Sequence, residues 1–408
     1  MMKKIACVCI VFLLLSVSGS AVACTGFMAV DEESVLMGNN EDWLYPDVYL
    51  WFYPSQAGKH GRMYIKCVYP LPSDPEYLSS FAGLNDQGLC FDVFLHPFLL
   101  PVNSSDKPVF HGDLMTYCLE VCSTVDEVLV FFSEYNLEFM EDIQYFVVDA
   151  SGNSVIIEGD HIIPRQGSFQ VVTNFLQSNP GQGWYPCWRY DTAVRMLENM
   201  SEVSVEYFRD ICAATHQEGT YPTIFSYVVD LNAGLIHLYH YYSYDAVVTF
   251  HLPEELGLGV HSYYLPGLFE PDGNQPPRVP DRPSGLTSGR VGVECTYSSV
   301  SSDVDDTVVY YLFDWGDGTT SPWVKQQDNG DGVATHTWTV QGAYEVKVKA
   351  KDIYGRESNW SESLPITMPY AYQPIPQFFE WLFQRFPTMF LVLRQLLGDY
   401  ETPLFFII

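Results

Sequence analysis

The sequence is poor in positive charge. Its 408 residues include 20 Lys and Arg against 50 Asp and Glu, which gives a formal net charge of -30. A surface this acidic repels phosphate and offers no basic stripe, so nucleic acid is excluded as a partner. The same field disfavours polyanionic substrates and anionic membrane surfaces. The length and an apolar content of 47% nevertheless predict real cores in about two or three domains.

Metal-binding motifs are lacking as well. No two cysteines have the C-x-x-C spacing of a zinc site. His237 and His240 are three apart in a predicted strand, so they face opposite sides of it. We therefore expect neither a metal nor a cofactor.

The N-terminus has the pattern of an export signal. Lys3 and Lys4 precede an uncharged apolar run over residues 5–17, and an A-x-A cleavage site ends at Ala23. This pattern predicts a signal peptide over residues 1–23 and a secreted or cell-surface protein. Two alternatives stay open: the run is kept as an anchor helix, although it is short for a span, or it is a lipobox that makes Cys24 a lipid anchor.

Cleavage after Ala23 would make Cys24 the first residue of the mature chain. A free α-amine titrates near neutral pH and would lie beside the thiol, so one residue supplies both nucleophile and proton acceptor. Eight cysteines remain after cleavage. If Cys24 stays free, the other seven cannot all pair, and we interpret most of them as small buried apolar residues.

The mature chain divides into four parts. Residues 24–268 alternate β-rich runs with helix-like stretches, which predicts a mixed α+β domain. Residues 269–285 are proline-rich and are predicted to be a linker with little that could pack. Residues 286–368 show short strands and frequent turns, as in a small β-sandwich. Residues 369–408 are aromatic and amphipathic, but Pro387 and charges break the apolar runs, which predicts no membrane span.

Secondary structure in the first domain can be anticipated from the pattern. Helices are expected over 112–135, over 189–199 and near 205–215. The strand candidates are 25–30, 34–38, 63–69, 88–95, 144–148, 154–158, 169–173, 227–230 and 235–242.

The first predicted hairpin carries a cluster of polar residues. If 25–30 and 34–38 pair across the acidic turn, the numbers of opposed residues sum to about 65. Cys24 then lies beside residues 39–42, which are Asn39, Asn40, Glu41 and Asp42. A carboxylate there can orient the N-terminal amine, as the third group of a catalytic triad orients its base.

Four motifs together resemble the choloylglycine hydrolase and penicillin V acylase family, which are N-terminal-nucleophile hydrolases of linear amides. The motifs are Cys24-Thr25-Gly26-Phe27, Gly38-Asn39-Asn40-Glu41-Asp42-Trp43, Gly83-Leu84-Asn85-Asp86-Gln87-Gly88-Leu89 and Val172-Thr173-Asn174. The resemblance spans nearly all of residues 24–250. It implies an αββα sandwich and hydrolysis of a carbon–nitrogen amide bond through an acyl-thioester on Cys24.

The resemblance also implies roles for particular residues. Asp42 matches the aspartate that contacts the amine of the nucleophile, and Asn174 matches the asparagine whose amide helps form the oxyanion hole. Arg189 resembles a later active-site arginine. A backbone N–H of Phe94 or Leu95 would complete the oxyanion hole, and the motif does not distinguish between them.

One departure from the family pattern concerns substrate binding. Many members carry arginine where this chain has Asn39. A neutral amide favours the thiolate less and adds no charged contact to a substrate. With Asn39 and Asn40 expected to bind substrate, and an acidic surface around them, neutral or cationic amides are favoured over anionic bile salts.

The second domain resembles a PKD domain, an immunoglobulin-like module of cell-surface proteins. The motifs are Asp314-Trp315-Gly316-Asp317-Gly318, His336-Thr337-Trp338 and Gly342-Ala343-Tyr344. The first is a turn in which aspartates cap backbone N–H groups; the alternative is calcium binding by Asp314 and Asp317. We expect this domain to display or dock the enzyme through cell-surface or matrix contacts.

The sequence thus predicts an exported amidohydrolase that acts on a small N-acyl amide. Two alternatives stay open. In an acyltransferase of the isopenicillin-N type, an amine would replace the attacking water on the same fold. In a surface binding protein, Cys24 would be lipidated or buried and would perform no chemistry.

Overall fold

The computed structural model describes residues 24–69, 77–96, 106–137, 140, 143–182, 185–305, 307–368 and 385. The predicted signal peptide, and the C-terminal segment apart from Arg385, lie outside the described residues. Within the described part of the chain, no helix is both long and apolar enough to cross a membrane.

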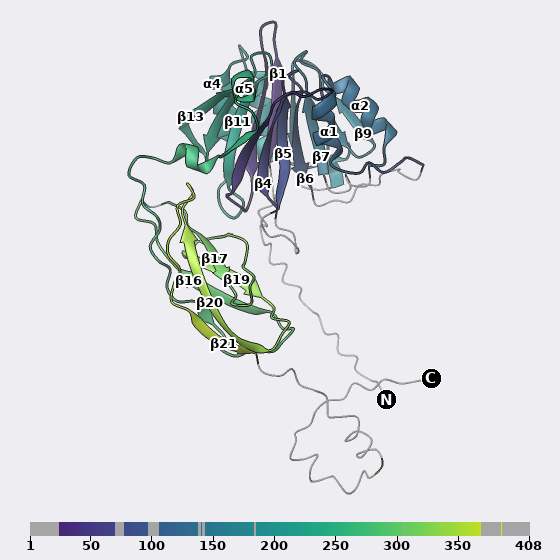
Figure 1. Cartoon of the computed structure of the whole chain (residues 1–408). Coiled ribbons are helices and arrows are strands. Elements are labelled where there is room, and N and C mark those ends of the chain that lie inside the picture. Colours follow the sequence, from purple (N-terminus) through teal and green to yellow (C-terminus); the bar gives the residue numbers. More distant parts are fainter. Residues whose placement is uncertain are drawn as a thin grey trace, which may run out of the picture.

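Two antiparallel sheets form the centre of the first domain (Figure 1). The six-stranded sheet has the order β10-β1-β2-β11-β12-β13, and the eight-stranded sheet has the order β14-β3-β4-β5-β6-β7-β8-β9. The first contains β10 (Phe169–Thr173), β1 (Thr25–Val30), β2 (Val35–Asp42), β11 (Thr223–Asp230), β12 (Leu235–His240) and β13 (Ser243–His251). The second contains β14 (His261–Tyr264), β3 (Val48–Tyr53), β4 (Arg62–Val68), β5 (Leu78–Asn85), β6 (Cys90–Leu95), β7 (Ile143–Val148), β8 (Ser154–Glu158) and β9 (His161–Pro164).

Helices cover the outer face of each sheet. The six-stranded sheet packs on α3 (Trp188–Glu198) and α4 (Val205–Thr215), and the eight-stranded sheet packs on α1 (Leu114–Val121) and α2 (Val125–Glu134). A third apolar cluster fills the space between the sheets. The layers therefore run helix, sheet, sheet, helix, as Figure 1 shows, and a short helix, α5 (Leu252–Gly257), follows β13.

Several predicted elements are confirmed. The strands expected over 25–30, 154–158 and 169–173 have those bounds, and α3 and α4 lie where helices were expected. The single helix expected over 112–135 is wrong, because it is two helices. Cys122 adopts an extended conformation, and Thr124 begins α2 by accepting a hydrogen bond from the Glu127 N–H at 3.3 Å.

The C-terminal domain is a sandwich of two small sheets. One has the order β15-β16-β19 and the other β18-β17-β20-β21. Their strands are β15 (Ser284–Gly285), β16 (Cys295–Val300), β17 (Tyr310–Asp314), β18 (Val324–Lys325), β19 (Asp331–His336), β20 (Gly342–Lys351) and β21 (Leu364–Met368). Trp315 and Trp338 are 1% exposed and lie at the centre of this core.

The proline-rich segment is packed, contrary to the expectation of a linker with little that could pack. Asn274, Pro277 and Pro280 are buried, whereas the residues between them are exposed. Burial of every third residue matches the threefold repeat of a polyproline II helix. The Arg278 N–H and the Asp281 N–H also bond to carbonyls of the sandwich, at 3.0 and 2.9 Å.

Close sheet packing at Gly26 gives a test of the fold. A Cβ on Gly26 would lie 2.6 Å from Phe94 Cζ, which belongs to the facing sheet, whereas a Cβ on Gly257 would meet nothing within 4 Å. Gly26→Ala should therefore lower the free energy of unfolding in urea by about 1–3 kcal/mol, because the packed ring has to shift. Gly257→Ala is the control. Equal stability of the two variants would contradict the close approach of the sheets.

Candidate active site

The pairing of β1 with β2 sets the neighbours of Cys24. Thr25 pairs with Asn40, which confirms the register expected for the hairpin. The next position along places Cys24 beside Glu41. Because side chains alternate between the two faces of a strand, Cys24 and Glu41 both point between the sheets, and Asp42 points toward the helices.

The Cys24 side chain is buried. Cys24 is 2% exposed, and its Sγ donates a hydrogen bond to Glu41 Oε1 at 3.2 Å. Burial, followed by the nearby Glu41 and Asp42 carboxylates, raises the pKa of the Cys24 thiol well above its ordinary value, although the Asp42 backbone N–H opposes this shift. The thiol is therefore neutral, and it needs a base in order to act as a nucleophile.

Two further carboxylates lie in the space between the sheets. Glu41 accepts a hydrogen bond from Asn39 Nδ2 at 3.3 Å, and Asp92 accepts hydrogen bonds from the Tyr227 hydroxyl and, at 2.7 Å, from the Val93 N–H. These donors are neutral. Burial raises the pKa of Asp92 to about 8, and burial together with Asp92 raises the pKa of Glu41 well above its ordinary value. A cation that approached Glu41 would favour its ionised form.

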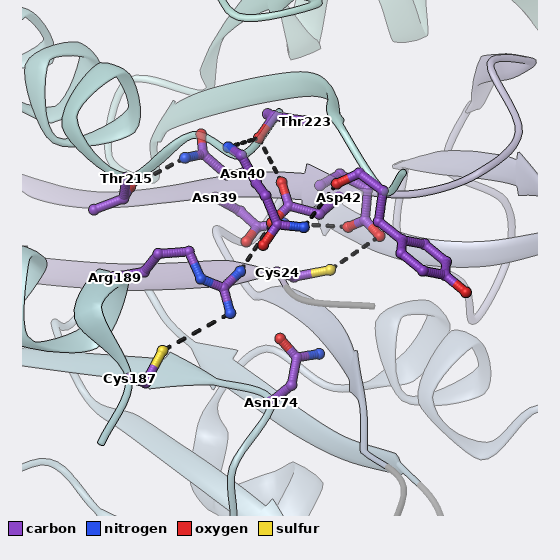
Figure 2. Close-up of polar contacts among 12 residues, drawn as sticks. Cys24, Asn39, Asn40, Asp42, Asn174, Cys187, Arg189, Thr215 and Thr223 are labelled. Atoms are coloured by element: carbon purple, nitrogen blue, oxygen red, sulfur yellow. Dashed lines mark hydrogen bonds and ion pairs between the residues drawn. The ribbon is translucent and has the colours of Figure 1, made fainter. Parts of the chain in front are cut away.

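Asp42 has charged and neutral partners. Its Oδ2 forms an ion pair with Arg189 NH1 of α3 at 2.8 Å, and its Oδ1 accepts a hydrogen bond from Thr223 Oγ1 at 2.5 Å. Figure 2 shows the guanidinium of Arg189 between Asp42 and Cys187. Burial raises the pKa of Asp42 to about 7, and Arg189 and Thr223 limit the rise.

Asn174 lies on the other side of Cys24. Thr25 pairs with Thr173 of the antiparallel strand β10. The next residue after Thr173, Asn174, therefore lies beside Cys24. The Asn174 side chain is buried, and its Nδ2 donates a hydrogen bond to the Leu95 carbonyl at 2.6 Å. An amide nitrogen carries two hydrogens, so this contact uses one of the two N–H bonds, and the Oδ1 of Asn174 has no hydrogen-bond partner among the described residues.

Asn39 and Asn40 point in opposite directions. Asn39 lies on the face of Glu41, and its Oδ1 has no hydrogen-bond partner among the described residues. Asn40 points toward α4, where its Nδ2 donates to Thr215 Oγ1 at 3.0 Å and its Oδ1 accepts from Ser226 Oγ at 2.6 Å. Asn40 thus ties β2 to its neighbours, and the residue of this strand that lines the cavity beside Cys24 is Glu41.

A cavity of about 400 Å³ opens beside the thiol. Besides Cys24 and Glu41, its polar lining consists of Ser79, Ser80 and Asp113, and no Lys or Arg is among the described residues that line it. Asp113 also caps α1 by accepting hydrogen bonds from two backbone N–H groups. The apolar and aromatic lining residues are Tyr69, Tyr77, Phe81, Val93, Leu95, Ile143 and Tyr145.

Sequence reasoning missed some of these residues. Asp92 had a detectable signal, because it is the only charged residue in the otherwise apolar strand β6. Thr223 had no such signal, because it reaches Asp42 only through the pairing of β11 with β2. Among the residues that the structure describes, no three His, Cys, Asp or Glu side chains are grouped to hold a metal ion.

Comparison with known proteins identifies the second domain. Residues 285–363 match the family model of the PKD domain. The chain contains a PKD domain. The solved PKD domain of an M14-like peptidase from Thermoplasmatales archaeon SCGC AB-540-F20 is 36% identical, and the match covers 24% of this chain and 99% of that one with a TM-score of 0.22.

The first domain has more distant matches. They include an arginine-to-leucine variant and a cysteine-to-alanine mutant of conjugated bile acid hydrolase from Clostridium perfringens, which are 14% and 12% identical. Each match covers 59% of this chain and 97% or 96% of the other, with a TM-score of 0.46. No curated protein matches the chain.

The aspartate turn of the PKD domain is a network of backbone caps, as expected from its glycines and aspartates. Asp314 Oδ1 accepts a hydrogen bond from the Gly316 N–H, and Asp317 Oδ1 accepts one from the Thr319 N–H, both at 3.0 Å. The other oxygen of Asp317 lies 2.8 Å from His336 Nε2. The prediction of a structural turn is therefore confirmed.

The buried carboxylates predict how stability depends on pH. Unfolded Asp and Glu residues lose their protons near pH 4, whereas folded Asp42 and Asp92 have pKa values of about 7 and 8. The folded chain therefore holds more protons in this range, and its free energy of unfolding should fall as pH rises from 5 to 8. Asp92→Asn should reduce the slope by up to about 1.4 kcal/mol per pH unit.

The measurement is urea unfolding of the mature chain at several pH values. Asp126→Asn is the matched control, because it makes the same substitution at an exposed position of α2. A slope that is the same in Asp92→Asn and the parent chain would show that Asp92 titrates normally.

Proposed function

We propose that the exported and cleaved protein is a cysteine N-terminal-nucleophile hydrolase that cleaves a linear carbon–nitrogen amide bond. The observation that carries this proposal is the position of Cys24. It precedes the first strand of the domain, it borders a cavity, and it lies between a carboxyl and an amide donor. The helix, sheet, sheet, helix order of layers supports an αββα hydrolase fold.

Because the thiol is neutral, the reaction begins with transfer of its proton to a base. The free α-amine of Cys24 accepts the thiol proton as Sγ attacks the amide carbonyl carbon. The carbon–nitrogen bond then breaks, the leaving amine takes that proton, and an acyl-thioester remains. Water attacks the thioester and gives its proton to the α-amine, and the acid leaves as the thiol is restored.

The surrounding residues would stabilise charge. The second N–H of Asn174 would donate a hydrogen bond to the oxyanion. One such donor lowers the activation barrier by about 3 kcal/mol. Asp42, held by Arg189 and Thr223, would orient the α-ammonium. Arg189 offsets part of the cost of burying the carboxylate and so favours the ionised form of Asp42.

Cys24→Ala tests this chemistry. It should reduce the release of amine from a panel of N-acyl amides by about a thousandfold or more, because no other residue replaces the nucleophile. Cys67→Ala is the control, because Cys67 is buried between the sheets and outside the cavity lining. Unchanged turnover in Cys24→Ala would refute the thioester mechanism.

Mass spectrometry of the mature N-terminus separates the alternatives. A free Cys24 supports catalysis, a diacylglyceryl adduct supports a lipid-anchored binding protein, and retention of residues 1–23 contradicts both. Adding free amines to the assay distinguishes the acyltransferase, because an acylated amine would then replace the free acid as product.

The charge around the cavity points to the class of acyl group. Glu41 lines the cavity, no Lys or Arg is among the described residues that line it, and the lining is otherwise largely aromatic or apolar. We propose that an aromatic or apolar acyl group that is neutral or bears an ammonium near the carbonyl is preferred over an anionic one. An ammonium would ionise Glu41 and form a charge-assisted hydrogen bond with it.

Three 4-nitroanilides test the preference: phenylalanyl, phenylacetyl and glutaryl. The first should have the highest kcat/KM and the last the lowest. Glu41→Gln should lower the ratio of phenylalanyl to phenylacetyl turnover by about tenfold to a hundredfold, the value of a charged hydrogen bond. Preference for the glutaryl compound, or an unchanged ratio in Glu41→Gln, would contradict the assignment.

A further inference from the structure

The two domains share a buried ion pair. Lys351, at the end of β20 in the PKD domain, is 3% exposed. Its Nζ contacts Asp47 Oδ1 of the first domain at 2.5 Å, and the same oxygen accepts a hydrogen bond from the Tyr264 hydroxyl at 3.0 Å. The ammonium also lies 4.3 Å from the centroid of the Trp323 ring. Such a pair holds its partners in a fixed geometry, since separating them would leave a buried charge.

The apolar cores of the two domains are continuous. Tyr310, the first residue of β17, is fully buried and belongs to the cluster that fills the space between the two large sheets. Its hydroxyl lies 3.2 Å from that of Tyr241, which is also buried. The PKD domain therefore contributes a side chain to the core of the catalytic domain.

The proline-rich segment strengthens this connection. Asn274 Nδ2 donates hydrogen bonds to Glu270 Oε1 at 3.1 Å and to Asp352 Oδ2 at 2.8 Å. Glu270 also forms an ion pair with Arg356 of the PKD domain. The segment is thus fixed at both ends and along its length, unlike a flexible tether.

The PKD domain also contacts two loops that lie next to Asp42. The first loop, residues 43–47, follows β2 directly and ends at Asp47, the partner of Lys351. The second, residues 216–222, precedes Thr223, and the Gly219 carbonyl in it accepts a hydrogen bond from Lys325 Nζ of the PKD domain. The loops are joined by a hydrogen bond of 3.1 Å from the Trp43 N–H to the Pro222 carbonyl.

A chain of aromatic rings continues from the first loop to the cavity. Tyr45 lines the interface with the PKD domain and contacts Trp43, with ring centroids 5.9 Å apart. Trp43 in turn contacts Tyr69 at 5.7 Å and Phe81 at 5.1 Å, both of which line the cavity beside Cys24. A movement of the first loop would therefore displace the aromatic side chains of the cavity wall.

We propose that the PKD domain is a structural part of the active site, in which Lys351 and Lys325 act as positioning residues that fix the loops 43–47 and 216–222 and thereby Asp42. Lys351 acts through Asp47, and Lys325 acts through the loop that ends at Thr223. The expected change in kcat rests on the proposed function. The expected change in the loops does not, because their positioning is a property of the folded chain.

Hydrogen exchange of the full mature chain tests the proposal directly. Lys351→Met should increase exchange in residues 43–47 and 216–222 by about tenfold or more, because Asp47 loses its buried partner and the loops open locally. The matched control is Lys349→Met. Lys349 lies on the same face of β20, and its ion pair with Glu357 stays within the PKD domain.

Two further variants keep the test decisive. Asp47→Asn combined with Lys351→Met removes both charges and should return exchange in these loops toward that of the parent chain. Lys325→Met, at a partly exposed position, removes one hydrogen bond without burying a charge and should increase exchange in 216–222 more than in 43–47. Unchanged loop exchange in both Lys351→Met and Lys325→Met would overturn the proposal.

Kinetics provide the second readout. In a chain that hydrolyses an N-acyl amide, Lys351→Met should lower kcat about tenfold or more with a smaller change in KM, since Asp42 orients the amine rather than the substrate. Lys351→Arg, which keeps the charge, should restore part of kcat. If the loops open but the parent chain has no hydrolase activity, the proposed function fails and the domain coupling stands. If hydrolysis proceeds and Lys351→Met leaves both kcat and loop exchange unchanged, the coupling fails.

Discussion

The antiparallel pairing of β1 with β2 on one side and β10 on the other is the constraint on which the candidate site depends. It brings Cys24 between Glu41 and Asn174, and it orients the thiol into the space between two sheets. Because side chains alternate along a strand, a shift of one residue in this register would move Glu41 to the helical face and Asp42 into the cavity. The apolar residues buried on both faces of β1 and β2 prevent such a shift.

Burial of the ionisable groups explains the electrostatics of the site. Glu41, Asp42 and Asp92 are buried close to the thiol, and only Asp42 has a guanidinium as a partner. In a low-dielectric environment the other two carboxyls, like the thiol, favour their neutral forms. An added positive charge would stabilise the ionised carboxylates of such a site. It could be the α-ammonium that cleavage after Ala23 creates on Cys24, or an ammonium on a substrate.

The PKD domain has a different relation to the first domain than its sequence suggests. The proline-rich segment and the family resemblance favour a spacer that displays an independent enzyme. In the structure, Lys351 and Tyr310 are buried against the first domain, and Asn274 joins the segment to both. The difference has a physical origin, because a buried ammonium is costly without a partner of opposite charge, and nothing near Lys351 in sequence reveals that Asp47 is that partner.

The sequence by itself determined the local parts of this protein. It specified the strands over 25–30 and 169–173, the register of the first hairpin and hence the neighbours of Cys24, because short-range turns and alternating patterns carry that information. The family resemblance pointed to Arg189 and Asn174, but only the tertiary structure showed that Arg189 and Thr223 are the partners of Asp42. Arg189 lies 147 positions from Asp42, and Thr223 lies 181 positions from it. Contacts over such distances depend on sheet order and helix packing, and a single sequence has no local signal for either.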